Sequence, residues 1–289
     1  MAKVPELPEV ETMKRGIVDV IGGQISGVLF PPCKLRPIAI EPSRTLFRRR
    51  LQGQTITGLG RLGKRVLVEL SDDLTLIFEP RMTGLVLVAS PPNRTHLRLK
   101  ILLENCPAQE LLFWDRRGLG SVRCLTRTEF QAKYGRGQLG PDALAITAPE
   151  LQSRLEKSRR PIKVALLDQK QVAGIGNLYA SEILHLAKID PNTACCLLGR
   201  RQWTRIQEAI LEILEEAIRY EGSTLSDGTY RNALNQAGSY QNAHRVYDQA
   251  GSRCKQCLRG EIVRIVQAQR STFYCPRCQK PRGRASQGI

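Results

Sequence analysis

Short runs of alternating apolar and polar residues fill the chain from about residue 17 to residue 124. The runs are rich in Val, Ile and Leu, and Gly, Pro, Ser, Asn and Asp separate them, as at residues 71–73 and 90–93. Runs of this length and spacing are typical of a β-sandwich or barrel. We expect one amphipathic helix over residues 9–21 and then strands over residues 24–30, 55–59, 65–70, 75–78, 84–89, 96–103, 111–114 and 120–124.

The pattern changes after the Gly-Pro-Asp break at residues 140–142. Apolar residues recur at helical spacing over residues 149–157, 161–169, 178–187 and 198–220, and a tight turn at residues 174–177 separates two of these helices. Residues 221–250 are rich in Gly, Ser, Asn, Gln and Tyr, so we expect a mobile loop there, including residues 226–240. The whole pattern predicts an α+β protein with domains at residues 1–138, 139–250 and 251–289.

Composition narrows the class of partner. The chain has 289 residues, 42% of them hydrophobic, which excludes a disordered chain, and a formal net charge of +17. That charge favours nucleic acid or an anionic membrane surface as partner, although a basic protein without either partner is also compatible with it. The chain contains no run of 18 apolar residues and no apolar signal core at its start, so we expect neither a membrane span nor secretion.

The nine cysteines indicate the cellular compartment of the protein and a metal-binding site. Nine is an odd number and five of them are scattered, so we expect the reducing cytoplasm. The other four form two C-x-x-C pairs, Cys254 with Cys257 and Cys275 with Cys278. Two such pairs can hold one Zn²⁺ tetrahedrally, and four thiolates leave no open position for a catalytic water. We therefore expect one structural zinc ion that folds a β-hairpin and holds Arg270 at its tip, where a guanidinium can grip phosphate.

The segment PELPEVET at residues 5–12 combines two prolines with three acids. Taken alone, this segment is explained as a proline-rich lead-in to a helix, whose N-terminus favours acidic residues. Together with the zinc module, it resembles the N-terminus of bacterial formamidopyrimidine-DNA glycosylases. Residues 270–279 (RSTFYCPRCQ) resemble the zinc hairpin of that family, and residues 167–169 and 173–182 resemble its helix–two-turn–helix motif. The resemblance covers nearly the whole chain in the right order, and PELPEV favours this branch over the related endonuclease VIII branch.

The resemblance implies a fold and an activity. The fold would be an N-terminal β-sandwich with a leading helix, then a helix–two-turn–helix region and a four-cysteine zinc-finger hairpin, with DNA in the cleft between them. The activity would be that of a bifunctional glycosylase and AP lyase, which excises 8-oxoguanine and formamidopyrimidines and nicks the strand by β,δ-elimination. The partner would be damaged double-stranded DNA, with no membrane involved, and the chain is expected to act as a monomer.

The family's catalytic residues carry over to four positions. Pro5 matches the proline whose secondary amine attacks the sugar C1′; an α-amino group titrates near pH 8, so a useful fraction is neutral at pH 7. Glu6 matches the acid that protonates the opening deoxyribose. Lys64 matches a turn lysine that contacts phosphate and assists elimination, although alone it would be an ordinary strand-end lysine. Arg270 matches the arginine that clamps phosphates beside the extruded nucleotide.

Further residues are implied because a damaged base must be flipped out and its place filled. Met82 matches the methionine that enters the duplex. The loop at residues 115–120 places Arg117 opposite the orphaned cytosine and Leu119 as a wedge, whereas a one-residue shift would choose Arg116 instead. Contacts with the DNA backbone or the lesion are expected at Arg94, Arg159, Lys163 and Asn177, the last at a helix N-terminus suited to phosphate.

The residues before Pro5 depart from the family pattern. As written, the Pro5 nitrogen is an amide and cannot act as a nucleophile. We hypothesise initiation at the Val4 codon, which would place methionine before Pro5 and free the amine after its removal. Otherwise the extension must be trimmed, or the protein is a non-catalytic paralogue that binds lesion DNA. An endonuclease VIII-like enzyme for pyrimidine lesions is a further alternative. A zinc-stabilised transcription factor would explain neither Pro5-Glu6 nor Lys64.

Overall fold

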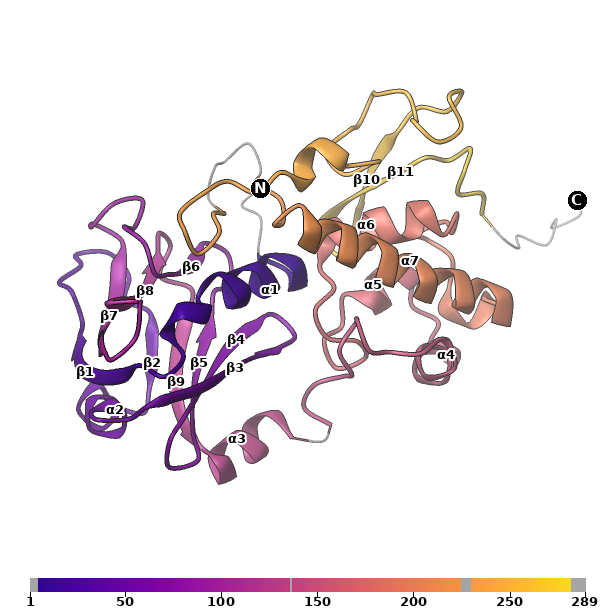
Figure 1. The fold of residues 1–289 in the computed structure, drawn as a ribbon. Coiled ribbons are helices and arrows are strands. Elements are labelled where there is room, and N and C mark those ends of the chain that lie inside the picture. The colour runs from indigo at the N-terminus through magenta and orange to yellow at the C-terminus, as the bar shows by residue number, and fades with distance from the viewer. Residues whose placement is uncertain (1–4, 136, 225–229, 282–289) are drawn as a thin grey trace, which may run out of the picture. The chain divides into compact units, whose positions relative to one another are not determined.

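The computed structural model describes residues 5–135, 137–224 and 230–281. The chain groups into two compact units (Figure 1). Unit 1 is Met1–Gln138 with Ala217–Gln241, and unit 2 is Leu139–Glu216 with Asn242–Ile289. The three-domain division expected from the sequence stays a prediction. In the described residues, no helix has both the length and the apolar character that a membrane span requires.

Unit 1 contains two β-sheets, and the expected α+β architecture is confirmed. A four-stranded sheet has the order β1-β7-β8-β6, and a five-stranded sheet has the order β2-β9-β5-β4-β3. Every expected strand is present, and β2, which pairs in parallel with β9, is an addition. The strands are β1 (Gln24–Leu29), β2 (Ala39–Glu41), β3 (Ile56–Leu62), β4 (Arg65–Leu70), β5 (Leu74–Glu79), β6 (Gly84–Leu87), β7 (Leu97–Glu104), β8 (Glu110–Asp115) and β9 (Ser121–Thr126).

Helix α1 (Leu7–Gly16) packs against the sheets through one apolar stripe. Val10, Met13 and Ile17, three and four residues apart, are fully buried. The expected helix over residues 9–21 is wrong at both ends: α1 begins earlier, and a separate 3₁₀ turn, η1 (Val18–Val20), follows it. Helices α2 (Arg44–Leu51) and α3 (Arg127–Tyr134) were not predicted. They bury little, since α2 buries two side chains and α3 buries none.

The segment Ala217–Gln241 belongs to unit 1. Tyr230 and Ala233 are buried in the hydrophobic core of the sandwich, and the Ala233 carbonyl accepts a hydrogen bond from the Val88 N–H. Part of the segment expected to be a mobile loop is therefore packed against the core. Residues 225–229, which also belong to the expected loop, lie outside the described residues.

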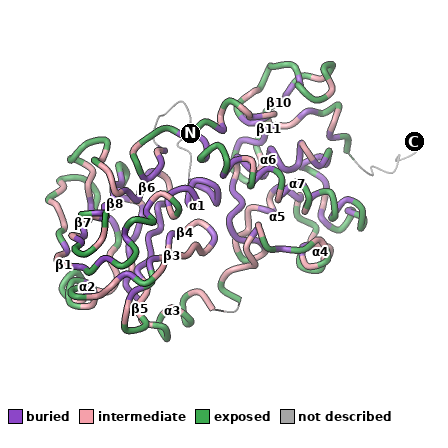
Figure 2. The backbone as a smooth tube through the Cα atoms, in the orientation of Figure 1, coloured by how far each residue is buried: buried purple, intermediate pink, exposed green. Residues whose placement is uncertain are grey.

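Unit 2 is helical and carries a two-stranded hairpin. Figure 2 shows buried residues along α6. In α7, Trp203, Ile206 and Ile210, which are three and four residues apart, are fully buried. Hairpin strand β11 packs against α6. The elements are α4 (Ala148–Leu155), α5 (Ile162–Leu166), α6 (Asn177–Leu186), η2 (Cys195–Leu197), α7 (Arg200–Arg219), η3 (Tyr240–Ala243), β10 (Val263–Gln267) and β11 (Arg270–Tyr274), of which α7 and η3 extend into unit 1.

The buried carboxylate of Glu182 fixes the chain that leads to the zinc module. It accepts the backbone N–H groups of Arg245, Val246 and Tyr247 at 2.7–3.0 Å. Burial raises the pKa of Glu182, while these hydrogen bonds act in the opposite direction. Three backbone donors on one side chain hold residues 245–247 against α6.

Candidate active site and zinc centre

Pro5 and Glu6 are held at the start of α1. Pro5 is buried, and Glu6, which caps the helix, is only 4% exposed. The Glu9 carboxylate accepts the Glu6 N–H through Oε2 at 2.9 Å and the Ser223 N–H through Oε1 at 2.9 Å. One carboxylate therefore fixes the first turn of the helix and the returning segment of unit 1 together.

An arginine that the sequence reasoning missed joins α1 to the turn that carries Lys64. The Arg61 Nε donates to Glu11 Oε2 at 2.9 Å, and its Nη1 donates to the Gly63 carbonyl at 3.1 Å. Gly63, with φ +56°, and Lys64 form the two-residue turn between β3 and β4, and Lys64 is partly exposed. No sequence signal distinguished Arg61 from neighbouring basic residues, because its role depends on a partner 50 positions away.

Glu11 is a charged anchor for this arrangement. Burial acts to raise its pKa, but hydrogen bonds from Lys14, Arg15 and Arg61 outweigh it and lower the pKa to about 2. Glu11 is therefore fully ionised at neutral pH, and the ion pair with Arg61 persists there.

The structure brings Met82 and Arg117 together. The Arg117 Nη1 lies 3.2 Å from the Met82 sulfur, and both side chains reach the surface. Below them, Asp115 is fully buried; its Oδ1 accepts the Arg117 N–H at 3.1 Å and the Thr83 hydroxyl, and its Oδ2 accepts the Gly120 N–H at 2.7 Å. Asp115 therefore fixes the two loops against each other.

The neighbouring candidates lie in the same unit. Arg94 and Arg116 are exposed, and Leu119 is half-buried. Gly118, between Arg117 and Leu119, has φ +62°, and a Cβ there would lie 2.1 Å from the Arg36 carbonyl. Only glycine fits this position, so the loop conformation that orients Arg117 is strongly determined.

In unit 2, Lys163 lies beneath Asn177 and the hairpin. The Lys163 side chain is fully buried, and its Nζ donates to Asn177 Oδ1 at 2.6 Å, to the Ser271 carbonyl at 3.1 Å and to Thr272 Oγ1 at 2.7 Å. Asn177, the first residue of α6, also donates through Nδ2 to the Ser271 carbonyl at 2.9 Å. The Lys163 ammonium therefore has three hydrogen-bond acceptors within unit 2, and the DNA contact expected of Lys163 stays a prediction.

The two remaining basic candidates of unit 2 are on the surface. Arg159 and Arg270 are both exposed. Arg270 pairs with Gln267 across a two-residue turn formed by Ala268 and Gln269, whose φ angles of +44° and +59° are typical of a tight hairpin. Arg270 therefore stands next to the hairpin tip, as the sequence predicted, with its guanidinium accessible.

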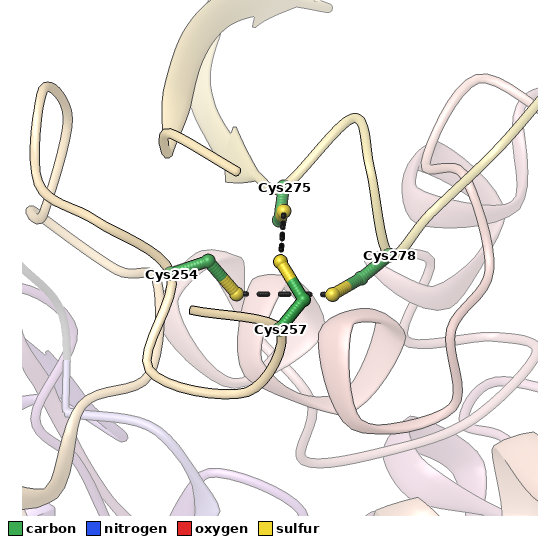
Figure 3. A group of neighbouring side chains, drawn as sticks. All are labelled: Cys254, Cys257, Cys275 and Cys278. Atoms are coloured by element: carbon green, nitrogen blue, oxygen red, sulfur yellow. Dashed lines mark hydrogen bonds between the residues drawn. The ribbon is translucent and has the colours of Figure 1, made fainter. Parts of the chain in front are cut away.

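The four cysteines of the two C-x-x-C pairs converge (Figure 3). Their sulfur atoms all lie within 4.8 Å of one another, and the distance is 3.8 Å both from Cys254 to Cys278 and from Cys257 to Cys275. A tetrahedron with Zn–S bonds of about 2.3 Å has S–S edges of about 3.8 Å, so the thiols fit a zinc ion.

The thiols also differ in acidity. The backbone N–H groups of Arg259 and Gly260 outweigh desolvation and lower the pKa of Cys257 to about 6, whereas burial and the neighbouring sulfurs raise the pKa of Cys278. A divalent cation offsets the repulsion among such closely spaced thiolates.

Family models match three consecutive parts of the chain. The formamidopyrimidine-DNA glycosylase N-terminal domain matches residues 4–122, its H2TH domain matches residues 139–229, and the zinc finger found in FPG and IleRS matches residues 251–281. These parts correspond in order to the sandwich, the helical region and the four-thiol hairpin. The fold and the cysteine cluster thus define a DNA-repair glycosylase with a zinc finger.

Relatives over the full length agree with the family models. A formamidopyrimidine-DNA glycosylase of Chloroflexus aurantiacus is 39% identical over 96% of this chain and 98% of the relative, and one of Streptococcus pyogenes is 35% identical over 96% and 100%. The chain belongs to the formamidopyrimidine-DNA glycosylase family, and the resemblance inferred from the sequence is confirmed.

Solved structures show the same fold. A Lactococcus lactis FPG mutant in complex with DNA containing Fapy-dG has a TM-score of 0.84 at 31% identity and covers 96% of this chain and 100% of its own. The MutM (FPG) protein of Thermus thermophilus has a TM-score of 0.82 at 33% identity and covers 95% and 98%.

Proposed function

We propose that this chain is a bifunctional DNA glycosylase and AP lyase that removes oxidised purines, 8-oxoguanine and formamidopyrimidines, from duplex DNA. The observation that carries the proposal is the buried Pro5-Glu6 pair at the capped start of α1, tied through Glu11 and Arg61 to the Lys64 turn. The membership of the chain in the family supports it. The scattered cysteines support a cytoplasmic setting, and we propose that the chain acts as a monomer.

The chemistry begins at the Pro5 nitrogen, which must be a free secondary amine. Its lone pair attacks the sugar C1′ and the nitrogen gives up its proton, while the bond to the damaged base breaks with its electrons leaving on the base, which takes up a proton. The C1′–O4′ bond then opens, Glu6 delivers a proton to O4′, and an iminium forms between Pro5 and C1′.

The iminium is an electron sink that drives both eliminations. Loss of a C2′ proton expels the 3′ phosphate, loss of a C4′ proton expels the 5′ phosphate, and water hydrolyses the remaining iminium to free Pro5. Lys64 is proposed to contact phosphate and assist these eliminations from the β3–β4 turn.

Recognition of the lesion is assigned to the adjacent pair Met82 and Arg117. We propose that they enter the space left by the flipped nucleotide, with Leu119 as a wedge and Arg117 facing the orphaned base. The contact between Arg117 and Met82, and the buried Asp115 that orients the Arg117 backbone, favour Arg117 over Arg116. Arg94 and Arg159 are proposed as DNA contacts on the ground of their exposed charge.

Unit 2 supplies phosphate contacts and the metal centre. We propose that Arg270 clamps phosphate, that Asn177 contacts the DNA backbone, and that Lys163 acts indirectly by positioning Asn177 and β11. Cys254, Cys257, Cys275 and Cys278 would hold one structural Zn²⁺, which folds the hairpin and leaves no open position for catalysis.

Borohydride trapping tests the mechanism. Two versions of the chain are compared, one whose first residue is Pro5 and one that keeps residues 1–4, each with duplexes containing 8-oxoguanine or an abasic site. The version that begins at Pro5 should form a covalent adduct and nick the strand, and Pro5→Gly should abolish or strongly reduce both. Equal trapping by the version that keeps residues 1–4 intact, checked by intact mass, would show that the Pro5 amine is not the nucleophile.

The same duplexes separate the alternatives. Binding of lesion DNA by both versions without any adduct would indicate a non-catalytic lesion binder. Preference for thymine glycol over 8-oxoguanine opposite C would indicate an endonuclease VIII-like enzyme. N-terminal sequencing of the protein from its native host shows whether Pro5 is freed in the cell.

A further inference from the structure

A buried histidine contacts one sulfur of the cysteine cluster. His185, on helix α6, is 1% exposed, and its Nε2 lies 3.4 Å from the Cys254 Sγ. Its other ring nitrogen, Nδ1, is buried and has no hydrogen-bond partner among the described residues. Among the described residues, the ring therefore has one hydrogen-bonding neighbour within reach, and that neighbour is a sulfur of the proposed zinc site.

The different surroundings of Nε2 and Nδ1 determine which of the two ring nitrogens carries the proton. A sulfur that binds a cation is a thiolate, which accepts hydrogen bonds and donates none. A proton on Nδ1 would be a buried donor without an acceptor and would set the Nε2 lone pair against the sulfur. A proton on Nε2 points at the Cys254 thiolate and leaves on Nδ1 only a bare acceptor, which is the less costly group to bury.

We propose that His185 is a positioning residue of the metal centre, which donates its Nε2–H to the Cys254 thiolate. The hydrogen bond draws charge from the sulfur, makes it a weaker nucleophile and fixes the first cysteine pair against α6. This inference rests on the proposed zinc site and extends it beyond the four ligands.

The hydrogen bond also gives α6 a second attachment to the zinc module. At the first position of the helix, Asn177 donates to the Ser271 carbonyl on β11. Eight residues later, His185 reaches Cys254, which lies ahead of β10 in the chain. The two contacts hold both arms of the module against one helix, so the cysteine site and the N-terminus of α6 are mechanically linked.

Cadmium-113 NMR of the intact chain tests the proton assignment without any substitution. In the ¹¹³Cd-loaded protein, the metal should show scalar coupling, through the Cys254 sulfur, to an imidazole Nε2–H. A protein that binds cadmium through four thiolates but has the His185 proton on Nδ1, or shows no such coupling, would overturn this inference and leave the zinc site intact. A protein that binds no cadmium would overturn both.

Substitutions test the effect on the sulfur. His185→Phe keeps an aromatic ring and removes the donor, so the sulfur-to-cobalt charge-transfer band of the Co²⁺-loaded protein should move to lower energy. Zinc release during alkylation by iodoacetamide should be faster by about twofold to tenfold, the range that one hydrogen bond accounts for. His185→Gln offers an amide N–H and should restore part of both properties.

The matched control is His244→Phe, which replaces another buried histidine of unit 2, one that packs edge-on against Tyr247 with ring centroids 5.9 Å apart. It should leave the charge-transfer band where it is. Thermal unfolding of the metal-loaded variants checks that each is folded. A band that stays unchanged in folded His185→Phe, or moves equally in His244→Phe, would overturn the inference.

Discussion

The guanidinium of Arg61 links helix α1, which Glu6 caps, to the turn that carries Lys64. Its Nε donates to Glu11 on α1 at 2.9 Å, and the two side chains are 9% and 8% exposed. Its Nη1 donates to the Gly63 carbonyl inside the turn at 3.1 Å. One planar side chain with fixed donor directions therefore sets the position of the turn relative to α1.

Replacement of Arg61 should slow catalysis more than it weakens DNA binding. Arg61→Leu removes the link, and a misplacement of about 1 Å at a reacting group can lower a rate by up to about 100-fold. We expect single-turnover nicking of abasic DNA to fall by about 10-fold to 100-fold with the DNA affinity nearly unchanged. Arg61→Lys keeps the charge but not the two-pronged geometry, so its nicking rate should lie between those of Arg61→Leu and the unsubstituted protein.

Arg15→Leu is the matched control for Arg61. Arg15 also donates to Glu11, at 2.9 Å, but it belongs to α1 itself and is 64% exposed. Its loss should leave the nicking rate close to that of the unsubstituted protein. If Arg15→Leu and Arg61→Leu slow the reaction equally, Arg61 acts only through the charge of Glu11 and does not position the turn.

Glu11 should make the stability of unit 1 depend on pH in the acid range. Its pKa is about 2 in the folded chain, below the ordinary value of 4.5. A depressed pKa gives stability that is complete above about pH 5 and lost as the pH falls from 4.5 towards 2. One pKa unit corresponds to about 1.4 kcal/mol, but two of the partners of Glu11 are partly exposed, and solvent screening reduces their contribution. Glu11→Gln should therefore lower the unfolding free energy at pH 7 by roughly 2 kcal/mol.

Denaturant unfolding at a series of pH values measures this effect. The difference between the unsubstituted protein and Glu11→Gln should shrink steadily between pH 5 and pH 3. Glu129 is a useful comparison, because Arg50 lowers its pKa to about 2 as well, although its side chain is 44% exposed. Salt should remove most of the effect of Glu129→Gln but little of the effect of Glu11→Gln. A difference for Glu11→Gln that stays constant with pH would contradict the role of its charge.

The parts of the fold that the sequence predicted are those fixed by local patterns. In β4, Val66, Val68 and Leu70 are buried in alternation, so the strand is visible in the sequence. The cysteine spacing is equally local. Helices α2 and α3 were missed because they bury two side chains and none, so no apolar stripe marks them.

The residues of the candidate site also fall into those that the sequence predicted and those that it missed. The resemblance supplied Pro5, Glu6 and Lys64, because their motif is contiguous or lies at a recognisable turn. It did not supply Arg61 or His185, whose roles depend on partners 50 and 69 positions away. Contacts between residues so far apart in the chain are set by tertiary packing. No short segment of the sequence indicates them.

Replacement of Gly222 should cost more unfolding free energy than the strain of its positive φ angle alone. It has φ +78°, and a Cβ there would lie 2.9 Å from both Cγ and Oε1 of Glu9. Gly53 has nearly the same φ, +79°, but nothing lies within 4 Å of its would-be Cβ. Gly53→Ala should therefore report the backbone strain alone, about 1 kcal/mol, while Gly222→Ala should add the displacement of Glu9.

Unfolding free energies and nicking rates of the two glycine variants separate the effects. We expect Gly222→Ala to lose about 2 to 4 kcal/mol and to nick more slowly, because Glu9 holds the first turn of α1 through the Glu6 N–H. Gly53→Ala should nick at the normal rate. Equal losses in the two variants would mean that the contact with Glu9 contributes nothing.

Lys163 and Arg270 should respond differently to salt. The Lys163 ammonium is buried among Asn177, Ser271 and Thr272, whereas Arg270 is exposed beside the hairpin tip. Each phosphate that a protein cation neutralises adds about one to the slope of log affinity against log salt. Arg270→Gln should therefore reduce that slope by about one. Lys163→Met should weaken binding at every salt concentration with the slope unchanged. It should also lower the unfolding free energy by about 3 kcal/mol, because two buried acceptors and one partly buried acceptor lose their donor. Fluorescence anisotropy with abasic duplexes over a salt series measures both slopes, and a slope reduced by one in folded Lys163→Met would mean that its ammonium turns outward to the DNA.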